Sequence, residues 1–230
     1  MNIKISCVLI FLVLIFPFCD NAIAKDGQGN FIVVLDAGHG GRDEGVKISR
    51  DLSEKELTLN FVVALKKNLD RSENIRAFLT RSSDRDLSET ERLRQASAEQ
   101  IDLLIRLHVN AGFDKNSSGF EMYYPGFKNT ATGRNDSKEI VKDMVSNKAL
   151  NESVRFSKIL QSNLDDLFPR KDRGLREGPV NTQSLTVPAL LLEIGFATNP
   201  KDRKSLQDAD VQKKIVEALE LSIREYFNKI

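Results

Sequence analysis

The chain has 230 residues, with 34 basic and 33 acidic side chains and a net charge of +1 at pH 7. This balance gives no electrostatic reason to expect nucleic acid binding, because nucleic-acid-binding domains carry a clear excess of basic groups. The length is sufficient for one domain with a complete hydrophobic core, and only two cysteines are available for disulfides or for metal ligation.

The first 24 residues have the pattern of a secretory signal peptide. A short basic start precedes an almost unbroken apolar run from Ile5 to Cys19, and Ala22-Ile23-Ala24 offers the small residues after which a signal peptidase cleaves. The run is short for a membrane span, and Phe18 is bulky for the residue before a lipid-modified cysteine. We therefore expect residues 1–24 to be removed and the protein to be exported, to the periplasm rather than to the medium, with no membrane span left.

Cleavage after Ala24 would remove both cysteines, Cys7 and Cys19. The remaining 206 residues would contain no thiol, so neither a disulfide nor a cysteine metal ligand is possible. We expect residues 25–230 to form one domain, in which the polar stretch at about residues 126–147 is an insertion.

Short strand-like runs alternate with amphipathic stretches along this domain. Apolar or β-favouring residues predict strands at Phe31–Leu35, Arg76–Thr80, Leu103–Val109, Phe120–Tyr124 and Ala189–Ile194. Apolar residues at helical spacing predict helices around Leu57–Leu65, from Ser88 through Ala96, at Phe156–Leu167 and at Ile215–Phe227. This alternation predicts an α/β domain with a twisted, mostly parallel sheet flanked by helices on both faces.

The only two histidines of the chain both lie beside predicted strands. His39 follows the run Phe31–Leu35, and His108 lies near the end of Leu103–Val109. In α/β proteins, ligands bind at the carboxyl ends of the strands, and histidine is the commonest metal ligand. The pattern therefore predicts a metal site that contains both histidines.

A third ligand is expected, because a catalytic zinc usually has three protein ligands and one open position. Without cysteine it should be a carboxylate, and Glu54 and Glu56 are the nearby candidates. Glu56 fits a capping box with Ser53. Glu54 lies on the apolar helical face of Leu57 and Phe61, where an unpaired carboxylate would cost several kcal/mol. This favours Glu54, although a solvated glutamate in a first helical turn would be stabilised by the helix dipole alone.

Glu193 is the remaining candidate for chemistry. It comes at the end of the most hydrophobic predicted strand and should point into the same crevice. Two interpretations are open: a catalytic carboxylate, or a buried salt bridge to Arg81 or Arg173. We also expect Asp36 to orient His39, and Asn110 to do the same for His108.

Five motifs together resemble the zinc-dependent N-acetylmuramoyl-L-alanine amidases of the amidase-3 type. In family order they are Val34–Gly45 (which contains Asp-Ala-Gly-His-Gly-Gly), Ser53–Leu59, Thr80–Asp84, Leu107–Ala111 and Glu193–Pro200, and the resemblance extends over roughly Phe31 to Phe227. It implies one zinc per chain.

The resemblance also assigns roles to residues of this chain. It implies that His39, Glu54 and His108 bind zinc and that Glu193 is the catalytic carboxylate. The implied substrate is peptidoglycan, cleaved at the amide between the lactyl group of N-acetylmuramic acid and the L-alanine of the stem peptide. Two alternatives stay open: a zinc peptidase that acts within the stem peptide, and a wall-binding module with an inactive site.

The insertion has a further implication. Ser137–Asn147 has helical spacing with one narrow apolar face. In related amidases with an insertion here, a helix covers the zinc until an activator protein displaces it. We therefore hypothesise that this segment occludes the site, with Glu139 near the metal. The alternative is that it only forms a wall of the substrate groove.

Overall fold

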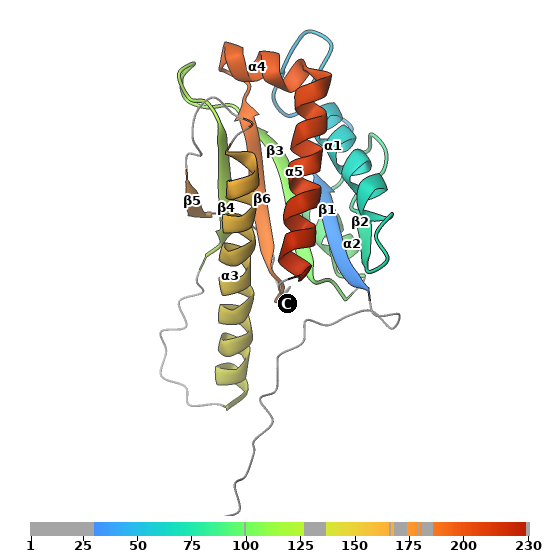
Figure 1. Cartoon of the computed structure of the whole chain (residues 1–230), viewed down its shortest axis with the longest axis vertical. Coiled ribbons are helices and arrows are strands. Elements are labelled where there is room, and N and C mark those ends of the chain that lie inside the picture. Colours follow the sequence, from blue (N-terminus) through green and yellow to red (C-terminus); the bar gives the residue numbers. More distant parts are fainter. Residues whose placement is uncertain are drawn as a thin grey trace, which may run out of the picture.

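A six-stranded sheet lies at the centre of the computed structural model (Figure 1). The structure describes residues 30–98, 100–126, 137–165, 167, 174–178, 180 and 186–228, with only the backbone described for 137–142. The strand order is β2-β1-β3-β6-β4-β5. The strands are β1 (Phe31–Ala37), β2 (Ile75–Leu79), β3 (Leu103–Asn110), β4 (Phe120–Pro125), β5 (Leu175–Gly178) and β6 (Ala189–Phe196). The predicted signal peptide and its cleavage site lie outside the described residues.

Most neighbouring strands run parallel. β2, β1, β3 and β6 are parallel, β4 is antiparallel to β6, and β5 is parallel to β4. The predicted mostly parallel sheet is therefore confirmed, with a reversed pair at one edge. All five predicted strands are present, and the short β5 is an addition.

Helices pack on both faces of the sheet, as predicted. They are α1 (Glu54–Leu69), α2 (Glu89–Ala96), α3 (Ser137–Leu164), α4 (Pro200–Gln207) and α5 (Ala209–Asn228). Val33 and Leu35 of β1 belong to the main core with α1, α3 and α5, whereas Ile32 and Val34 pack with Ala96 of α2. Since alternate residues of a strand point to opposite faces, α2 lies on the other face from these helices.

The parallel strands bring the predicted site residues to one edge of the sheet. β1, β3 and β6 all end at the same edge, where α4 begins (Figure 1). His39 comes two residues after β1, while His108 and Glu193 lie in the last parts of β3 and β6. The Gly38 amide donates to the Leu107 carbonyl, 3.0 Å away, which joins the two histidine-bearing segments.

Helix α3 corrects two expectations about the insertion. The predicted helices Ser137–Asn147 and Phe156–Leu167 are largely parts of one helix of 28 residues, which ends at Leu164. The Ser153 hydroxyl accepts a hydrogen bond (2.9 Å) from the amide of Ala189, the first residue of β6. The part of α3 that precedes Ser153 therefore extends past the amino end of β6, as Figure 1 shows.

This placement contradicts the hypothesis of an occluding helix. Ser137–Asn147 lies at the end of the fold opposite to the carboxyl ends of β1 and β3, where His39 and His108 are (Figure 1). A helix there neither covers the site nor lines a groove beside it, so the hypothesis is wrong for this segment. The side chain of Glu139 and residues 127–136 lie outside the described part of the chain.

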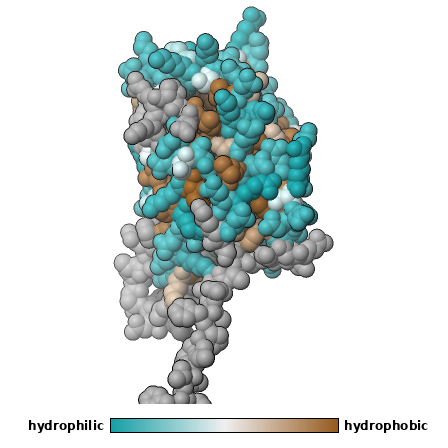
Figure 2. Space-filling model, viewed as in Figure 1, coloured by the Kyte–Doolittle hydropathy of each residue, from teal (hydrophilic) through white to brown (hydrophobic). Residues whose placement is uncertain are grey.

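The face that carries α3, α4 and α5 is mostly hydrophilic, with apolar residues scattered among the polar ones (Figure 2). Within the described residues, no helix has the length and apolar character needed to cross a membrane.

Candidate metal centre

His39 has an unusual backbone and a fixed ring. Its φ is +60°, in the left-handed region that residues other than glycine seldom adopt. The Nδ1 atom lies 2.8 Å from Oδ2 of Asp43, so Nδ1–H donates to this carboxylate, and in the neutral imidazole the lone pair is on Nε2. Nε2 lies 3.1 Å from Oε1 of Glu54. The ring therefore presents a ligand atom toward Glu54.

Glu54 is the first residue of α1 and its side chain is almost completely buried. Backbone amides hold both carboxylate oxygens: Val109 N–H donates to Oε1 (2.9 Å) and Val46 N–H to Oε2 (3.0 Å). Burial alone would raise the pKa of Glu54, but contacts with His108 and His39 outweigh it and lower the pKa to about 2. The group is thus a carboxylate at any physiological pH.

His108 completes the cluster from β3. Its Nδ1 lies 3.0 Å from Oε1 of Glu54, and its ring is 5.0 Å from that of His39, in an edge-to-face arrangement. Gly38 leaves room for the ring, because a Cβ at that position would come within 2.6 Å of it. Gly45 has the same role near Glu54, since a Cβ there would be 2.5 Å from Oε2.

The three side chains could hold one metal ion. One ligand atom from each of His39, Glu54 and His108 lies within 4.8 Å of the others. Four ligands around zinc at 2.0–2.1 Å would be about 3.4 Å apart, close to the 3.0 and 3.1 Å that separate the Glu54 oxygen from the two ring nitrogens. Two imidazoles and a carboxylate are also a typical donor set of catalytic zinc.

The structure also shows which of the two candidate glutamates lies at the histidines. Glu56 is exposed, and its carboxylate accepts from the amide of Ser53, which is the capping-box contact. Only Glu54 reaches the histidines, in agreement with the argument from helical faces.

Glu193 lies in a row of polar side chains across three strands. In the strand register it is opposite His108 of β3 on one side and Glu121 of β4 on the other, so all three point to one face of the sheet. The pKa of Glu193 is raised, mainly by burial and secondly by the neighbouring Glu121 carboxylate. A carboxylate with a raised pKa accepts and releases protons closer to neutral pH than an exposed one.

Asn110 connects the two carboxylates of this row. Its Oδ1 accepts from the amide of Gly112 (2.7 Å), which fixes the orientation of the side-chain amide. Nδ2 then donates to Glu193 and to Glu121, the latter at 2.9 Å. Asn110 therefore positions Glu193, and the expectation that it orients His108 is wrong.

One other expectation about a supporting residue is also corrected. Asp36 does not contact His39: its carboxylate accepts from Thr80 and forms ion pairs with Arg92 and Arg106, at 2.8 and 2.9 Å. Asp43 orients His39 instead, although no pattern in the sequence had identified Asp43 as a member of the site.

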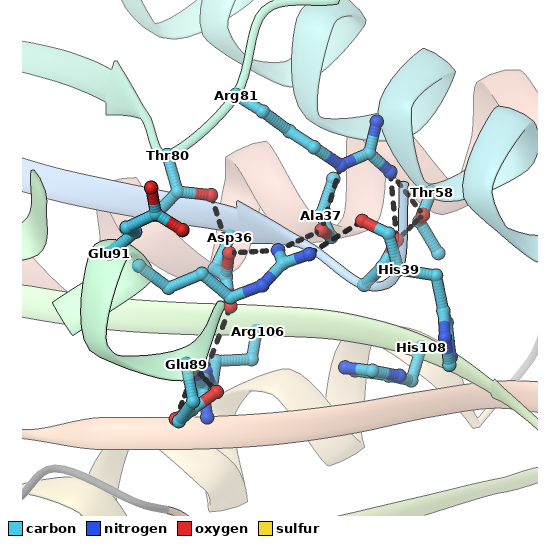
Figure 3. A network of polar contacts seen from close by, with 12 residues as sticks. Asp36, Ala37, His39, Thr58, Thr80, Arg81, Glu89, Glu91, Arg106 and His108 are labelled. Carbon is cyan, nitrogen blue, oxygen red and sulfur yellow. Dashed lines mark hydrogen bonds and ion pairs between the residues drawn. The ribbon is translucent and has the colours of Figure 1, made fainter. Parts of the chain in front are cut away.

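Arg81, one possible salt-bridge partner of Glu193, donates instead to the backbone carbonyls of Ala37 and Gly38, near His39 (Figure 3). The other possible partner, Arg173, lies outside the described residues. Glu121 also belongs to the site, through its contact with Asn110. This contact depends on strand pairing that the sequence does not reveal.

Comparison with known proteins agrees with this architecture. A family model described as N-acetylmuramoyl-L-alanine amidase matches residues 33–225. The chain therefore belongs to the amidase-3 family, and its activity is that of an N-acetylmuramoyl-L-alanine amidase acting on peptidoglycan.

Individual relatives support the assignment. The chain is 31% identical over 198 residues to the uncharacterized protein YqiI of Bacillus subtilis, covering 86% of this chain and 85% of YqiI. It is 23% identical over 219 residues to the amidase AmiC of Escherichia coli O6:H1, covering 85% of this chain but only 52% of AmiC. The solved catalytic domain of the amidase CwlV from Bacillus (Paenibacillus) polymyxa var. colistinus superposes with a TM-score of 0.64 at 28% identity, covering 86% of this chain and 98% of that domain.

Proposed function

We propose that this protein is an exported, zinc-dependent amidase that cleaves the bond between the lactyl group of N-acetylmuramic acid and the L-alanine of the stem peptide. The observation that carries the proposal is the convergence of His39, Glu54 and His108 on one point beside Glu193. One zinc per chain would be held by the two histidines and Glu54. When bound, zinc supplies a Lewis acid that polarises the substrate carbonyl and makes a water more acidic.

The residues of the chain would carry the protons in this reaction. Glu193, next to His108 in the sheet, takes a proton from the attacking water and delivers it to the nitrogen of the leaving L-alanine. Asn110 holds the Glu193 carboxylate toward the site, while Asp43 keeps His39 in the tautomer that ligates through Nε2. Because Glu193 both accepts and delivers the proton, the reaction requires no second general acid or base.

The two alternatives differ from this proposal in what they predict. A peptidase would need the same metal site but would cut between amino acids of the stem peptide. An inactive wall-binding module would be expected to have lost a member of the site, whereas all four predicted residues are present and close together. Membership of the amidase family favours cleavage at the lactyl–alanine bond.

Digestion of purified sacculi tests the bond assignment directly. Mass spectrometry of the products should find stem peptides that begin with a free L-alanine amine, and glycan chains that remain intact. A chelator should stop the release, and added zinc should restore it. Products cut between two amino acids of the stem would replace the amidase by the peptidase, and release that is insensitive to the chelator would contradict the metal requirement.

Export gives a separate prediction. We expect N-terminal sequencing of the protein recovered from the cell envelope to begin at Lys25, because Ala22-Ile23-Ala24 provides the small residues for cleavage. The mature protein should then be active in the presence of a reductant, since it contains no cysteine. A lipid-modified N-terminus at Cys19 would contradict both the cleavage site and the release from the membrane.

A further inference from the structure

Three consecutive carbonyl groups at the end of β1 are held by two buried arginines. The residues are Ala37, Gly38 and His39, and the last of them has the left-handed backbone. Such a conformation is unfavourable for a residue other than glycine and persists only where the surrounding structure enforces it. Figure 3 shows the Arg81 guanidinium over this turn, beside Ala37, His39 and Thr58.

Arg81 joins the segments of two metal ligands. Its Nη2 donates to the carbonyl of Gly38 and to that of Lys55, both at 2.8 Å. Gly38 precedes His39, and Lys55 follows Glu54. The Nε atom donates to Ala37 O at 3.1 Å, which fixes the plane of the guanidinium. One nitrogen atom therefore sets the spacing between the His39 and Glu54 segments.

Arg92 also holds this turn. It donates to Ala37 O (2.6 Å) and to His39 O (2.5 Å), and its charge is paired with Asp36 at 2.8 Å. Arg81 is different, because within the described residues each of its hydrogen bonds goes to a neutral oxygen. A salt bridge therefore does not explain why this cation is 1% exposed.

We propose that Arg81 is a positioning residue that prearranges His39 and Glu54 for metal binding. The inference rests on the proposed zinc function. A guanidinium offers donors in a fixed planar fork, so it contacts Ala37, Gly38 and Lys55 at once. A lysine would keep the charge but offers a single nitrogen that cannot reproduce this fork. The side chain acts on the metal only through these carbonyls.

The test compares Arg81→Lys with Arg106→Lys. Arg106 is a matched control, because it is also a buried arginine, but its side-chain hydrogen bonds within the described part of the chain go to the carboxylates of Asp36 and Glu89 rather than to backbone carbonyls. Zinc affinity is measured by competition with a chromophoric chelator, and ligand geometry by the visible spectrum of the cobalt-loaded protein. We expect Arg81→Lys to bind zinc about 10–100-fold more weakly with an altered cobalt spectrum, as for other residues that orient ligands. Arg106→Lys should leave both unchanged.

Thr58 provides a second, milder variant. Its hydroxyl lies 3.1 Å from the Gly38 carbonyl and 2.9 Å from that of Glu54, so it supports the same two segments. Thr58→Val should weaken zinc binding, and Thr58→Ser should retain the normal affinity. This pair decides the question if Arg81→Lys does not fold.

Several outcomes would overturn the inference. They are normal affinity and cobalt spectrum in Arg81→Lys, equal weakening in Arg106→Lys, or, where Arg81→Lys does not fold, no difference between Thr58→Val and Thr58→Ser. If the unaltered protein itself binds no zinc, the proposed function fails, and this result is distinguishable from a failure of the role of Arg81.

Discussion

Glu193→Gln is expected to lower turnover by about 10²–10⁴-fold, the usual effect of removing a general acid–base group. Glutamine has nearly the same shape and can still contact Asn110, but it cannot accept a proton from the attacking water. The fold and the bound zinc should be retained, because Glu193 is not among the three ligand side chains. The measurements are turnover on labelled sacculi, metal content and the circular dichroism spectrum.

Glu121→Gln is the matched control for this variant. Glu121 lies opposite Glu193 in the sheet and is also a carboxylate, but it is 4% exposed and accepts from Asn110 and Tyr123. Weakening such a hydrogen bond costs about 0.5–1.5 kcal/mol, so turnover should fall by about tenfold or less. Near-normal activity of a folded, zinc-loaded Glu193→Gln protein would make Glu193 a structural residue. An equal loss in both variants would indicate that the whole row, rather than Glu193, is required.

The second large effect is expected at the metal ligands. His39→Ala, His108→Ala and Glu54→Gln should each abolish stoichiometric zinc binding, and with it the release of stem peptides. The physical reason is that a catalytic zinc site has only three protein ligands, so each loss leaves two. Metal analysis after dialysis against a defined zinc buffer measures the binding.

Glu56→Gln is the control for Glu54→Gln. The two glutamates are two positions apart at the start of α1, and glutamine preserves a capping box with Ser53. Glu56→Gln should therefore keep both zinc and activity. Full zinc occupancy in either histidine variant, or zinc loss in Glu56→Gln, would contradict the ligand assignment.

The local pattern of the sequence was sufficient for the parts of the fold that depend on periodicity. The apolar run Phe31–Leu35 predicted the strand β1, and the face of α1 that carries Leu57 and Phe61 predicted which glutamate is buried. Because parallel strands end at one edge of a sheet, the positions of His39 just after one such run and of His108 near the end of another predicted that they lie together.

The parts that could not be predicted depend on contacts between distant segments. Asn110 was assigned to His108 because the two are close in the sequence, but the pairing of β3 with β6 and of β6 with β4 brings Asn110 beside Glu121 and Glu193. Asp36 was assigned to His39 for the same reason. Its true partners, Arg92 and Arg106, come from α2 and β3, and no local signal identifies them.

The position of helix α3 could not be predicted for a different reason. The polar composition before Asn147 indicated an insertion, and the apolar spacing was correct for a helix. Periodicity gives neither the direction of a helix relative to the sheet nor whether two helical stretches are continuous. The contacts of Ser153 with the start of β6 and of Asn163 with Ser222 of α5 show that direction and place the first part of α3 away from the metal centre (Figure 1).

The three proposed ligands come from three separate elements: the turn after β1, the first residue of α1, and β3. An unfolded chain does not bring them together, so zinc would bind the native protein alone. Binding of this kind raises the free energy of unfolding by about 1.4 kcal/mol for each tenfold increase in free zinc above the dissociation constant. In zinc-poor surroundings the protein would therefore become a better target for proteases as well as a weaker hydrolase, and the supply of the ion would set how much of it persists in the cell envelope.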